Sequence, residues 1–186
     1  MKVGILGGTF NPPHIGHLIL AQETLDKAGL DRIFFIPTNI PPHKNAILVK
    51  AEHRLNMVKL SLKENRNFSL LDLEVKRGGV SYTIDTVKEL KKKFPRHKFY
   101  LIIGSDLAKE FHAWEKYREI QRLVKIIVAS REAYPFSKRE NFILMNILQI
   151  NISSSLIRGL LQKGFSVKYL VHPDVEKYIK KNKLYI

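Results

Sequence analysis

The stretch Gly7-Gly8-Thr9-Phe10-Asn11-Pro12-Pro13-His14-Ile15-Gly16-His17 stands between an apolar run, Val3 to Leu6, and a segment with helical periodicity. It is therefore expected at a strand-to-helix junction. The first turn of a helix leaves backbone N–H groups unpaired and carries the positive end of the helix dipole, so an anion binds favourably there. Glycines let the chain approach the anion, and histidine nitrogens donate hydrogen bonds to phosphate oxygens. The junction predicts a nucleotide-phosphate site.

Length and composition limit the class of protein. The chain has 186 residues, 45% of them apolar, which is enough for one core, and we expect a single domain over residues 1–186. Because the chain has no cysteine, disulfides, thiolate metal sites and a cysteine nucleophile are excluded. No basic leader precedes a long apolar stretch, and no apolar run approaches a bilayer span. We expect a cytoplasmic protein without a membrane partner.

The charge balance is strongly basic. Lys and Arg number 32 against 17 Asp and Glu, for a formal net charge of +15, which indicates attraction to polyanions such as nucleic acid, ATP or pyrophosphate. Charge alone does not choose among them. Much of it lies in runs such as Lys91-Lys92-Lys93 and Lys180-Lys181, where a solvated helix face is the simpler interpretation.

Apolar runs alternate with helical periodicity along the chain. The predicted strands are Lys2–Leu6, Ile33–Ile36, Ser69–Val75, Tyr100–Ile103, Lys125–Val128 and Ile147–Ile150. Four helices are predicted. The first has Leu18, Ala21, Leu25 and Ala28 on its inner face and ends at Gly29. The second covers Glu52–Lys63, the third is marked by Ile84, Val87 and Leu90, and the fourth is marked by Leu156, Ile157, Leu160 and Leu161. The alternation predicts an α/β fold with a doubly wound, mainly parallel sheet and helices on both faces.

In such sheets, ligands bind beyond the carboxyl ends of the strands. Polar segments follow the predicted strands at Gly7–His17, Pro37–Lys44, Ser81–Thr83, Gly104–Asp106, Ser130-Arg131 and Ser153–Ser155. Simpler roles compete for these residues. Ser81, Thr83, Ser105 and Ser153 precede predicted helices, where a cap contributes about 1 kcal/mol. Trp114 is equally suited to a core or to stacking on a ligand.

Two other classes fit the opening stretch less well. A dinucleotide oxidoreductase needs G-x-G-x-x-G, which Gly4, Gly7 and Gly8 do not form, and an acid after the second strand, where Ile36-Pro37-Thr38-Asn39 offers none. A zinc site on His14 and His17 needs a third protein ligand and a supporting shell. No nearby residue clearly supplies one, so we predict no protein-held metal.

Two distant motifs resemble one superfamily. His14-Ile15-Gly16-His17 resembles the signature of the nucleotidyltransferases, which include class I aminoacyl-tRNA synthetases, and Ile152 to Arg158 is similar to their I-S-S-T-x-I-R motif. The chain is too short for a synthetase, and Phe136-Ser137-Lys138 matches the lysine-serine loop of those enzymes poorly. The expected fold is therefore a Rossmann-like nucleotidyltransferase.

Within the superfamily, the chain resembles the bacterial nicotinate-nucleotide adenylyltransferases over essentially its whole length. The middle motifs that carry this resemblance are Pro41-Pro42-His43-Lys44, Ser81-Tyr82-Thr83-Ile84-Asp85-Thr86, and Gly104-Ser105-Asp106 followed by Phe111-His112-x-Trp114. Phosphopantetheine adenylyltransferases share the two ends but lack the Ser-Tyr-Thr and Phe-His-x-Trp elements.

The resemblance implies adenylyl transfer from ATP to nicotinate mononucleotide, giving nicotinate adenine dinucleotide and pyrophosphate in NAD biosynthesis. Mg²⁺ would be carried by the ATP phosphates. Such transfers depend on positioning and on stabilising charge at phosphate oxygens, so no protein nucleophile or base is needed.

The residue roles also follow from the resemblance. His17, His14 and Arg158 are the expected catalytic residues, with His17 closest to the developing charge. ATP contacts are expected from Gly8, Thr9, Phe10, His14, His17, Asp106, Ser153, Ser154 and Arg158. Nicotinate mononucleotide contacts are expected from Lys44 at the phosphate, from Tyr82 and Thr83 at the carboxylate, and from Trp114 at the ring.

Two positions depart from the family pattern. Asn11 stands where many relatives have aspartate, so it receives no metal or ionic role, and Ser155 replaces threonine while keeping the hydroxyl. Three alternatives stay open: a related enzyme acting on nicotinamide mononucleotide, one acting on phosphopantetheine, and a basic nucleic-acid-binding protein. The last rests on charge alone, because no recognition module is present, and we expect no nucleic-acid partner. The residues do not decide acid against amide, or the oligomeric state.

Overall fold

The computed structural model describes residues 1–42, 49–130, 142–148 and 150–185. Its strands are β1 (Lys2–Gly8), β2 (Arg32–Pro37), β3 (Phe68–Leu70), β4 (Lys98–Gly104), β5 (Lys125–Ser130) and β6 (Phe142–Asn146). Its helices are α1 (Ile15–Lys27), α2 (Ala51–Leu62), α3 (Leu73–Arg77), α4 (Thr83–Lys93), α5 (Ser105–Lys109), α6 (Tyr117–Leu123), α7 (Ser154–Gln162) and α8 (Pro173–Lys181), with a 3₁₀ turn at Phe111–Ala113. None of the helices in these ranges is both long and apolar enough to span a membrane.

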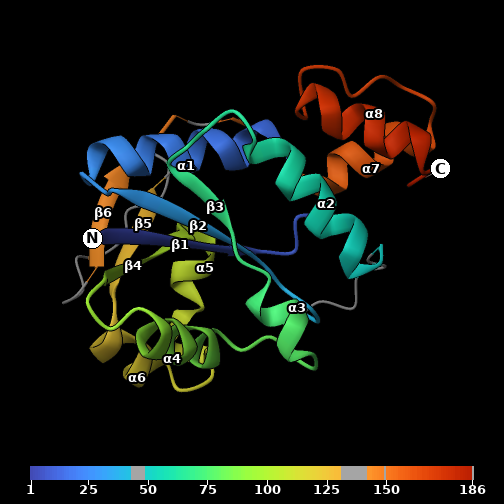
Figure 1. Ribbon diagram of the computed structural model, residues 1–186. Helices are drawn as coiled ribbons and strands as arrows, with labels where there is room; N and C mark the ends of the chain where they lie inside the picture. The colour runs from blue at the N-terminus through green and yellow to red at the C-terminus, as the bar shows by residue number, and fades with distance from the viewer. Residues whose placement is uncertain (43–48, 131–141, 149, 186) are drawn as a thin grey trace.

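The six strands form one parallel sheet in the order β3-β2-β1-β4-β5-β6. Helices α1 and α2 cover one face, and α4 and α6 cover the other (Figure 1). The predicted doubly wound α/β fold is confirmed. Because the strand order reverses between β1 and β4, the ligand crevice of such a sheet is expected at the carboxyl ends of these two strands.

Alternating strand residues supply the two faces. In β1, Val3 and Ile5 enter the core under α4 and α6, whereas Leu6 enters the core under α1 and α2. Gly4 also faces the second core, where a Cβ would lie 2.6 Å from Ile33 Cδ1 and 2.8 Å from Ile102 Cδ1. The absence of a side chain at Gly4 lets its neighbours close over β1.

Helix α1 packs and ends as its sequence predicts. Leu18, Ala21, Leu25 and Ala28 all belong to or pack against the core on its face of the sheet. Gly29 takes φ +57°, and the N–H of Leu30 donates to the carbonyl of Leu25 at 2.9 Å. This αL cap, which glycine adopts without steric cost, turns the chain into β2.

The strand predicted at Ser69–Val75 is wrong over most of its length. Pairing with β2 involves only Phe68–Leu70, and the chain then forms α3 at Leu73–Arg77. The Leu-rich run suits either element, and its pairing with β2 stops at Leu70, opposite Phe35. The extra residues turn inward and bury Glu74.

The strand predicted at Ile147–Ile150 is also wrong. The last strand is Phe142–Asn146, which pairs with β5 from Ile126 to Ser130. Ile147, Leu148 and Ile150 lie beyond β6 outside any helix or strand, and residue 149 lies outside the described residues. Their apolar side chains line a cavity instead of a sheet face.

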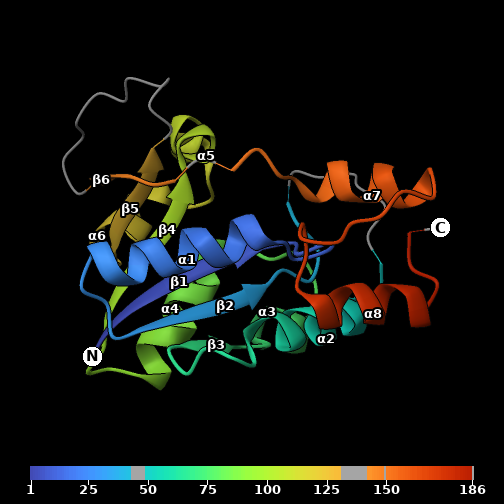
Figure 2. The ribbon, with the colours of Figure 1, turned by 90° about the horizontal axis from the view of Figure 1, so that it is seen from above.

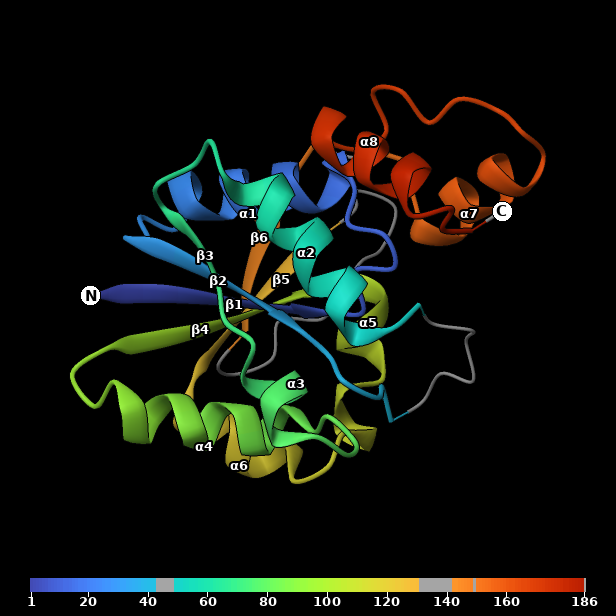
Figure 3. The same ribbon diagram turned by 45° about the vertical axis from the view of Figure 1, so that its right-hand side comes forward.

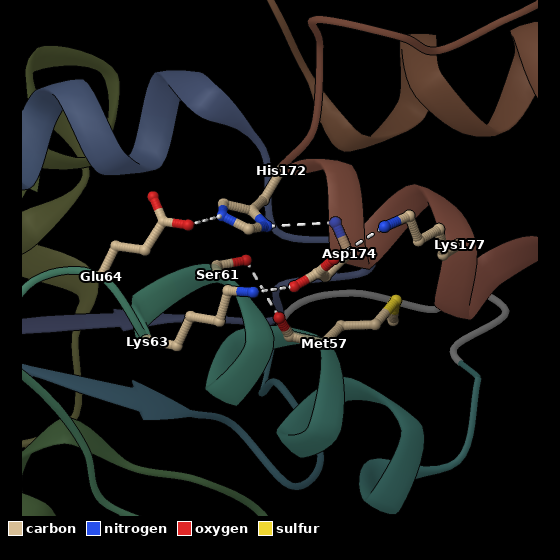
Figure 4. A network of polar contacts seen from close by, with 7 residues as sticks. All are labelled: Met57, Ser61, Lys63, Glu64, His172, Asp174 and Lys177. Carbon is tan, nitrogen blue, oxygen red and sulfur yellow. Dashed lines mark hydrogen bonds and ion pairs between the residues drawn. The ribbon is translucent and has the colours of Figure 1, made fainter.

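A third cluster attaches the C-terminal helices. Met57 of α2 belongs to one apolar cluster with Ile157 of α7 and with Val175 and Ile179 of α8. Both C-terminal helices lie at the same end of the sheet, with α8 next to α2 (Figure 2). Polar contacts reinforce this attachment: Lys63 pairs with Asp174, and the His172 ring, which accepts the Asp174 N–H at 3.2 Å, lies near Glu64 (Figure 4). The C-terminal segment thereby borders the carboxyl ends of the strands.

Candidate active site

Two cavities open at the carboxyl ends of β1 and β4. The first, about 150 Å³, lies beside α1 and is lined by His14, His17, Gly104, Asp106, Ile147 and Ile152, among others. The second, about 310 Å³, is lined by Gly8, Thr9, Thr38, Tyr82, Thr83 and Trp114, among others. The loop over residues 7–17 contributes to both. The predicted nucleotide site therefore lies where the strand order reverses.

His17 is oriented from two sides in the first turn of α1. Its Nδ1 accepts a hydrogen bond from the backbone N–H of His14 at 3.1 Å, and its ring meets the Phe10 ring edge-on with centroids 5.0 Å apart. Because Nδ1 is the acceptor, the proton of neutral His17 sits on Nε2. The geometry makes Nε2–H a donor for a ligand.

His14 lies beneath His17 as a buried, neutral ring. The two ring centroids are 3.6 Å apart with planes inclined by 33°. Burial lowers the pKa of His14 to about 4. The glycine between them leaves room for this stack, because a Cβ on Gly16 would lie 3.0 Å from His14 Nδ1. A nearby phosphate would favour the protonated ring, since an opposite charge stabilises the charged form.

In the loop before α1, the side chain of Phe10 is turned into the core. Phe10 has φ +48° and is 1% exposed, and its ring packs against Phe35 in the core. A Cβ on Gly8 would lie 3.2 Å from that ring. Any ligand contact of Phe10 would therefore be made by its backbone.

The start of α7 binds the same loop. Ser154 Oγ donates to the carbonyl of Pro12 at 2.8 Å, and Arg158 Nη1 donates to the carbonyl of Asn11 at 2.9 Å. Ser153 caps α7 by accepting the N–H of Leu156 at 3.1 Å. The fold thus brings the two distant motifs together, although Ser153, Ser154 and Arg158 line neither cavity. Their contacts with phosphate stay a prediction.

The residues expected around nicotinate mononucleotide gather at the second cavity. Tyr82 and Thr83 stand at the start of α4, and half-buried Trp114 packs on Phe111 with ring centroids 5.2 Å apart. Trp114 therefore serves the core and faces the cavity. Asp106 lines the first cavity. Lys44 and Arg131, which the sequence also singled out, lie outside the described residues.

Comparisons with known proteins show the family of this chain. A cytidylyltransferase-like family model matches residues 5–160. The nicotinate-nucleotide adenylyltransferase of Bacillus subtilis is 38% identical, over 99% of this chain and 98% of that protein. The probable nicotinate-nucleotide adenylyltransferase of Lactiplantibacillus plantarum is 44% identical, over 99% of this chain and 88% of that protein. This chain belongs to the nicotinate-nucleotide adenylyltransferase family.

The fold of this family member is also similar to a solved structure. The nicotinic acid mononucleotide adenylyltransferase of Plasmodium falciparum, complexed with NaAD, superimposes with a TM-score of 0.84 at 25% identity, over 99% of this chain and 97% of that chain. The Rossmann-like nucleotidyltransferase fold expected from the sequence is confirmed.

Three of the four expected serine and threonine caps are wrong. Of these four residues, only Ser153 accepts a hydrogen bond as the cap of its helix. Tyr82 and Gly104 hold the cap positions of α4 and α5, so that Thr83 and Ser105 are the first helical residues. The Ser81 hydroxyl instead accepts the N–H of Asn39 at 2.8 Å and joins the segment before α4 to the loop after β2. A tertiary contact therefore takes the place of a local cap.

Two buried polar residues of this family member, Glu74 and Arg54, were not singled out from the sequence, and the contact that buried Asn11 makes was not predicted. Glu74, which lines the second cavity, accepts a hydrogen bond from Thr86 Oγ1 at 2.6 Å, and burial raises its pKa. Asn11 Oδ1 accepts the hydroxyl of Tyr185 at 2.9 Å. Arg54 is 1% exposed. A signal existed for Arg54, which falls one turn before Val58 on the buried face of α2.

Proposed function

We propose that this chain transfers the adenylyl group of ATP to nicotinate mononucleotide, giving nicotinate adenine dinucleotide and pyrophosphate in NAD biosynthesis. The observation that carries this proposal is one loop lining two cavities. Gly7, Gly8 and Thr9 line the second cavity, whereas His14 and His17 line the first. Two substrates bound in the two cavities would meet at this loop, which is what a transfer between two nucleotides requires.

The reaction needs charge stabilisation more than covalent chemistry. A phosphate oxygen of nicotinate mononucleotide forms a bond to the α-phosphorus of ATP, and the bond from that phosphorus to the bridging oxygen of pyrophosphate breaks. Negative charge develops on the phosphate oxygens. The hydrogen bond from the His14 N–H to Nδ1 orients the His17 ring. The Nε2–H of that ring is then placed to donate to these oxygens. Arg158 at the start of α7 supplies a permanent positive charge beside the same loop.

Mg²⁺ is proposed to arrive with ATP. Bound to the phosphates, it would neutralise charge on their oxygens. Across the described parts of the chain, no three His, Asp or Glu side chains cluster as a metal site. In this proposal the phosphates themselves hold the cation, and every protein group above acts as a hydrogen-bond donor or a charge.

The second cavity suits an acid more than an amide. The first turn of α4, which begins at Thr83, leaves N–H groups without helical partners and carries a positive partial charge, and both favour a carboxylate. Trp114 offers an aromatic face to the pyridine ring. Glu74 lies on the same wall, and burial raises the pKa of its carboxyl group.

A pyrophosphate-release assay tests the proposal. Nicotinate mononucleotide, nicotinamide mononucleotide and phosphopantetheine are offered in parallel with ATP, each with and without Mg²⁺. We expect Mg²⁺-dependent release with nicotinate mononucleotide and a much lower kcat/KM with the other two. Release with none of the three, or preferential release with either alternative, would overturn the proposal.

A further inference from the structure

Arg54 is a fully buried cation surrounded by backbone carbonyls. Its Nη1 donates to the carbonyl of Thr9 at 2.9 Å and to that of Thr38 at 2.6 Å. Its Nη2 donates to the carbonyl of Asn39 at 3.0 Å, and its Nε donates to that of Val49 at 3.2 Å. One side chain of α2 thereby joins the loop after β1 to the loop after β2.

The carbonyls that Arg54 holds belong to residues of the site. Thr9 and Thr38 both line the second cavity, and Thr9 stands in the phosphate-binding loop. Because the guanidinium is 1% exposed, oxygens bonded to it point into the protein and away from the cavity. Without this partner, these oxygens would be free to turn toward the cavity, where their partial negative charge would oppose a phosphate.

A structural role alone does not explain the choice of residue. In the described part of the chain, no ion pair joins Arg54 to a carboxylate, and its hydrogen-bond partners there are neutral carbonyls. Burying a charge without an opposite charge is costly. A positive charge behind a phosphate-binding loop, however, is offset when an anionic substrate binds in front of it.

We propose that Arg54 is a positioning residue for adenylyl transfer, which keeps the carbonyls of Thr9, Thr38 and Asn39 turned away from the substrate phosphates and places a fixed positive charge behind them. This inference rests on the proposed function. The effect belongs to the transition state, in which charge on the phosphate oxygens is greatest. Replacing Arg54 should therefore lower kcat more than it raises KM.

Two substitutions separate charge from geometry. Arg54→Lys keeps the charge but not the planar fork, and Arg54→Gln loses both. We expect kcat to fall about 10-fold in the lysine variant and about 100-fold in the glutamine variant, of the order seen when one stabilising donor is removed. KM for ATP and for nicotinate mononucleotide should change by less than about threefold. Each variant is assayed well below its own melting temperature.

Val58→Ala is the matched control. Val58 lies one turn after Arg54 in α2, is fully buried and belongs to the core. The substitution should therefore lower the melting temperature while leaving kcat within about twofold. Pyrophosphate release by the unsubstituted protein tests the function separately. The inference is overturned if Arg54→Gln keeps its kcat, if its loss of kcat merely matches that of Val58→Ala, or if neither Arg54 variant folds.

Discussion

His17 shows how a backbone contact selects the chemistry of one side chain. The His14 N–H donates to Nδ1 of His17. The buried His14 ring packs beneath the His17 ring. Burial lowers the pKa of His14 to about 4, so the ring adds no charge. The stack thus presents one donor and one neutral ring to a phosphate. Protonation of His14 would be favoured only once a phosphate lies near.

Replacing His17 tests the donor. His17→Ala should fold and lose about 10²- to 10³-fold in kcat, because one donor to the developing charge is removed. His17→Gln keeps an amide N–H and should recover part of that loss. Both are measured by pyrophosphate release, with circular dichroism as the control for folding. Near-normal turnover in His17→Ala would refute the role of His17.

His14 should make the free protein sensitive to acid. Burial lowers the pKa of His14 from 6.5, the value of an unburied histidine, to about 4, so between these pH values the unfolded chain binds the proton more readily. The free energy of unfolding should therefore fall by roughly 3 kcal/mol as the pH drops from 6.5 to 4, with no contribution from His14 above that window.

Urea unfolding at several pH values measures this contribution. His14→Asn should show a shallower loss of stability over the same window than the unsubstituted protein. Equal slopes for the two proteins would mean that His14 does not carry the effect.

Among the elements, β1 depends on the absence of a side chain at Gly4. The strand lies between two cores, and its neighbours Ile33, Ile102 and Leu30 close over Gly4 at 2.6, 2.8 and 3.1 Å from the position of a Cβ.

Gly4→Ala should therefore destabilise the protein by about 1–3 kcal/mol through overpacking of the core. Gly159→Ala is the matched control, because no atom lies within 4 Å of its Cβ position and alanine favours the interior of α7, with an expected gain of about 0.5–1 kcal/mol. Chemical denaturation measures both. A neutral Gly4→Ala would show that the neighbouring side chains rearrange freely.

For the molecule as a whole, the end of the chain reaches back to its beginning. Helix α8 packs against α2 at the end of the sheet (Figure 3), and the hydroxyl of Tyr185 donates to Asn11 Oδ1 at 2.9 Å. The same oxygen accepts the N–H of Val49 at 3.3 Å. Asn11 thus joins the loop after β1 to the segment before α2 and to the C-terminal segment as a neutral acceptor.

Tyr185→Phe tests this link. Burial raises the pKa of Tyr185, so its hydroxyl stays protonated and donates at every pH of interest. Removing it should cost about 1 kcal/mol of stability and lower kcat several-fold, because the loop loses one of its anchors. Tyr169→Phe, at an exposed tyrosine, is the control. Unchanged turnover in Tyr185→Phe would show that the loop holds its position without the C-terminus.

The sequence by itself determined the fold class and most of the elements. Short apolar runs and helical periodicity are local, so they identified β1, α1 with its glycine cap, α2 to within one residue, and β4 and β5. Their alternation predicted the parallel sheet, and therefore the edge at which the site lies. The two histidines and the serine-arginine segment were recognisable because their residue types and spacing are specific.

Only the tertiary structure decided what these elements touch. The edge strands β3 and β6 were misplaced, because the length of a strand depends on the partners its neighbour offers and not on its own apolar run. Arg54 and Asn11 are buried polar groups whose hydrogen-bond partners come from distant parts of the chain. Since such groups are stable inside only when those partners are in place, their roles appear once the chain is folded.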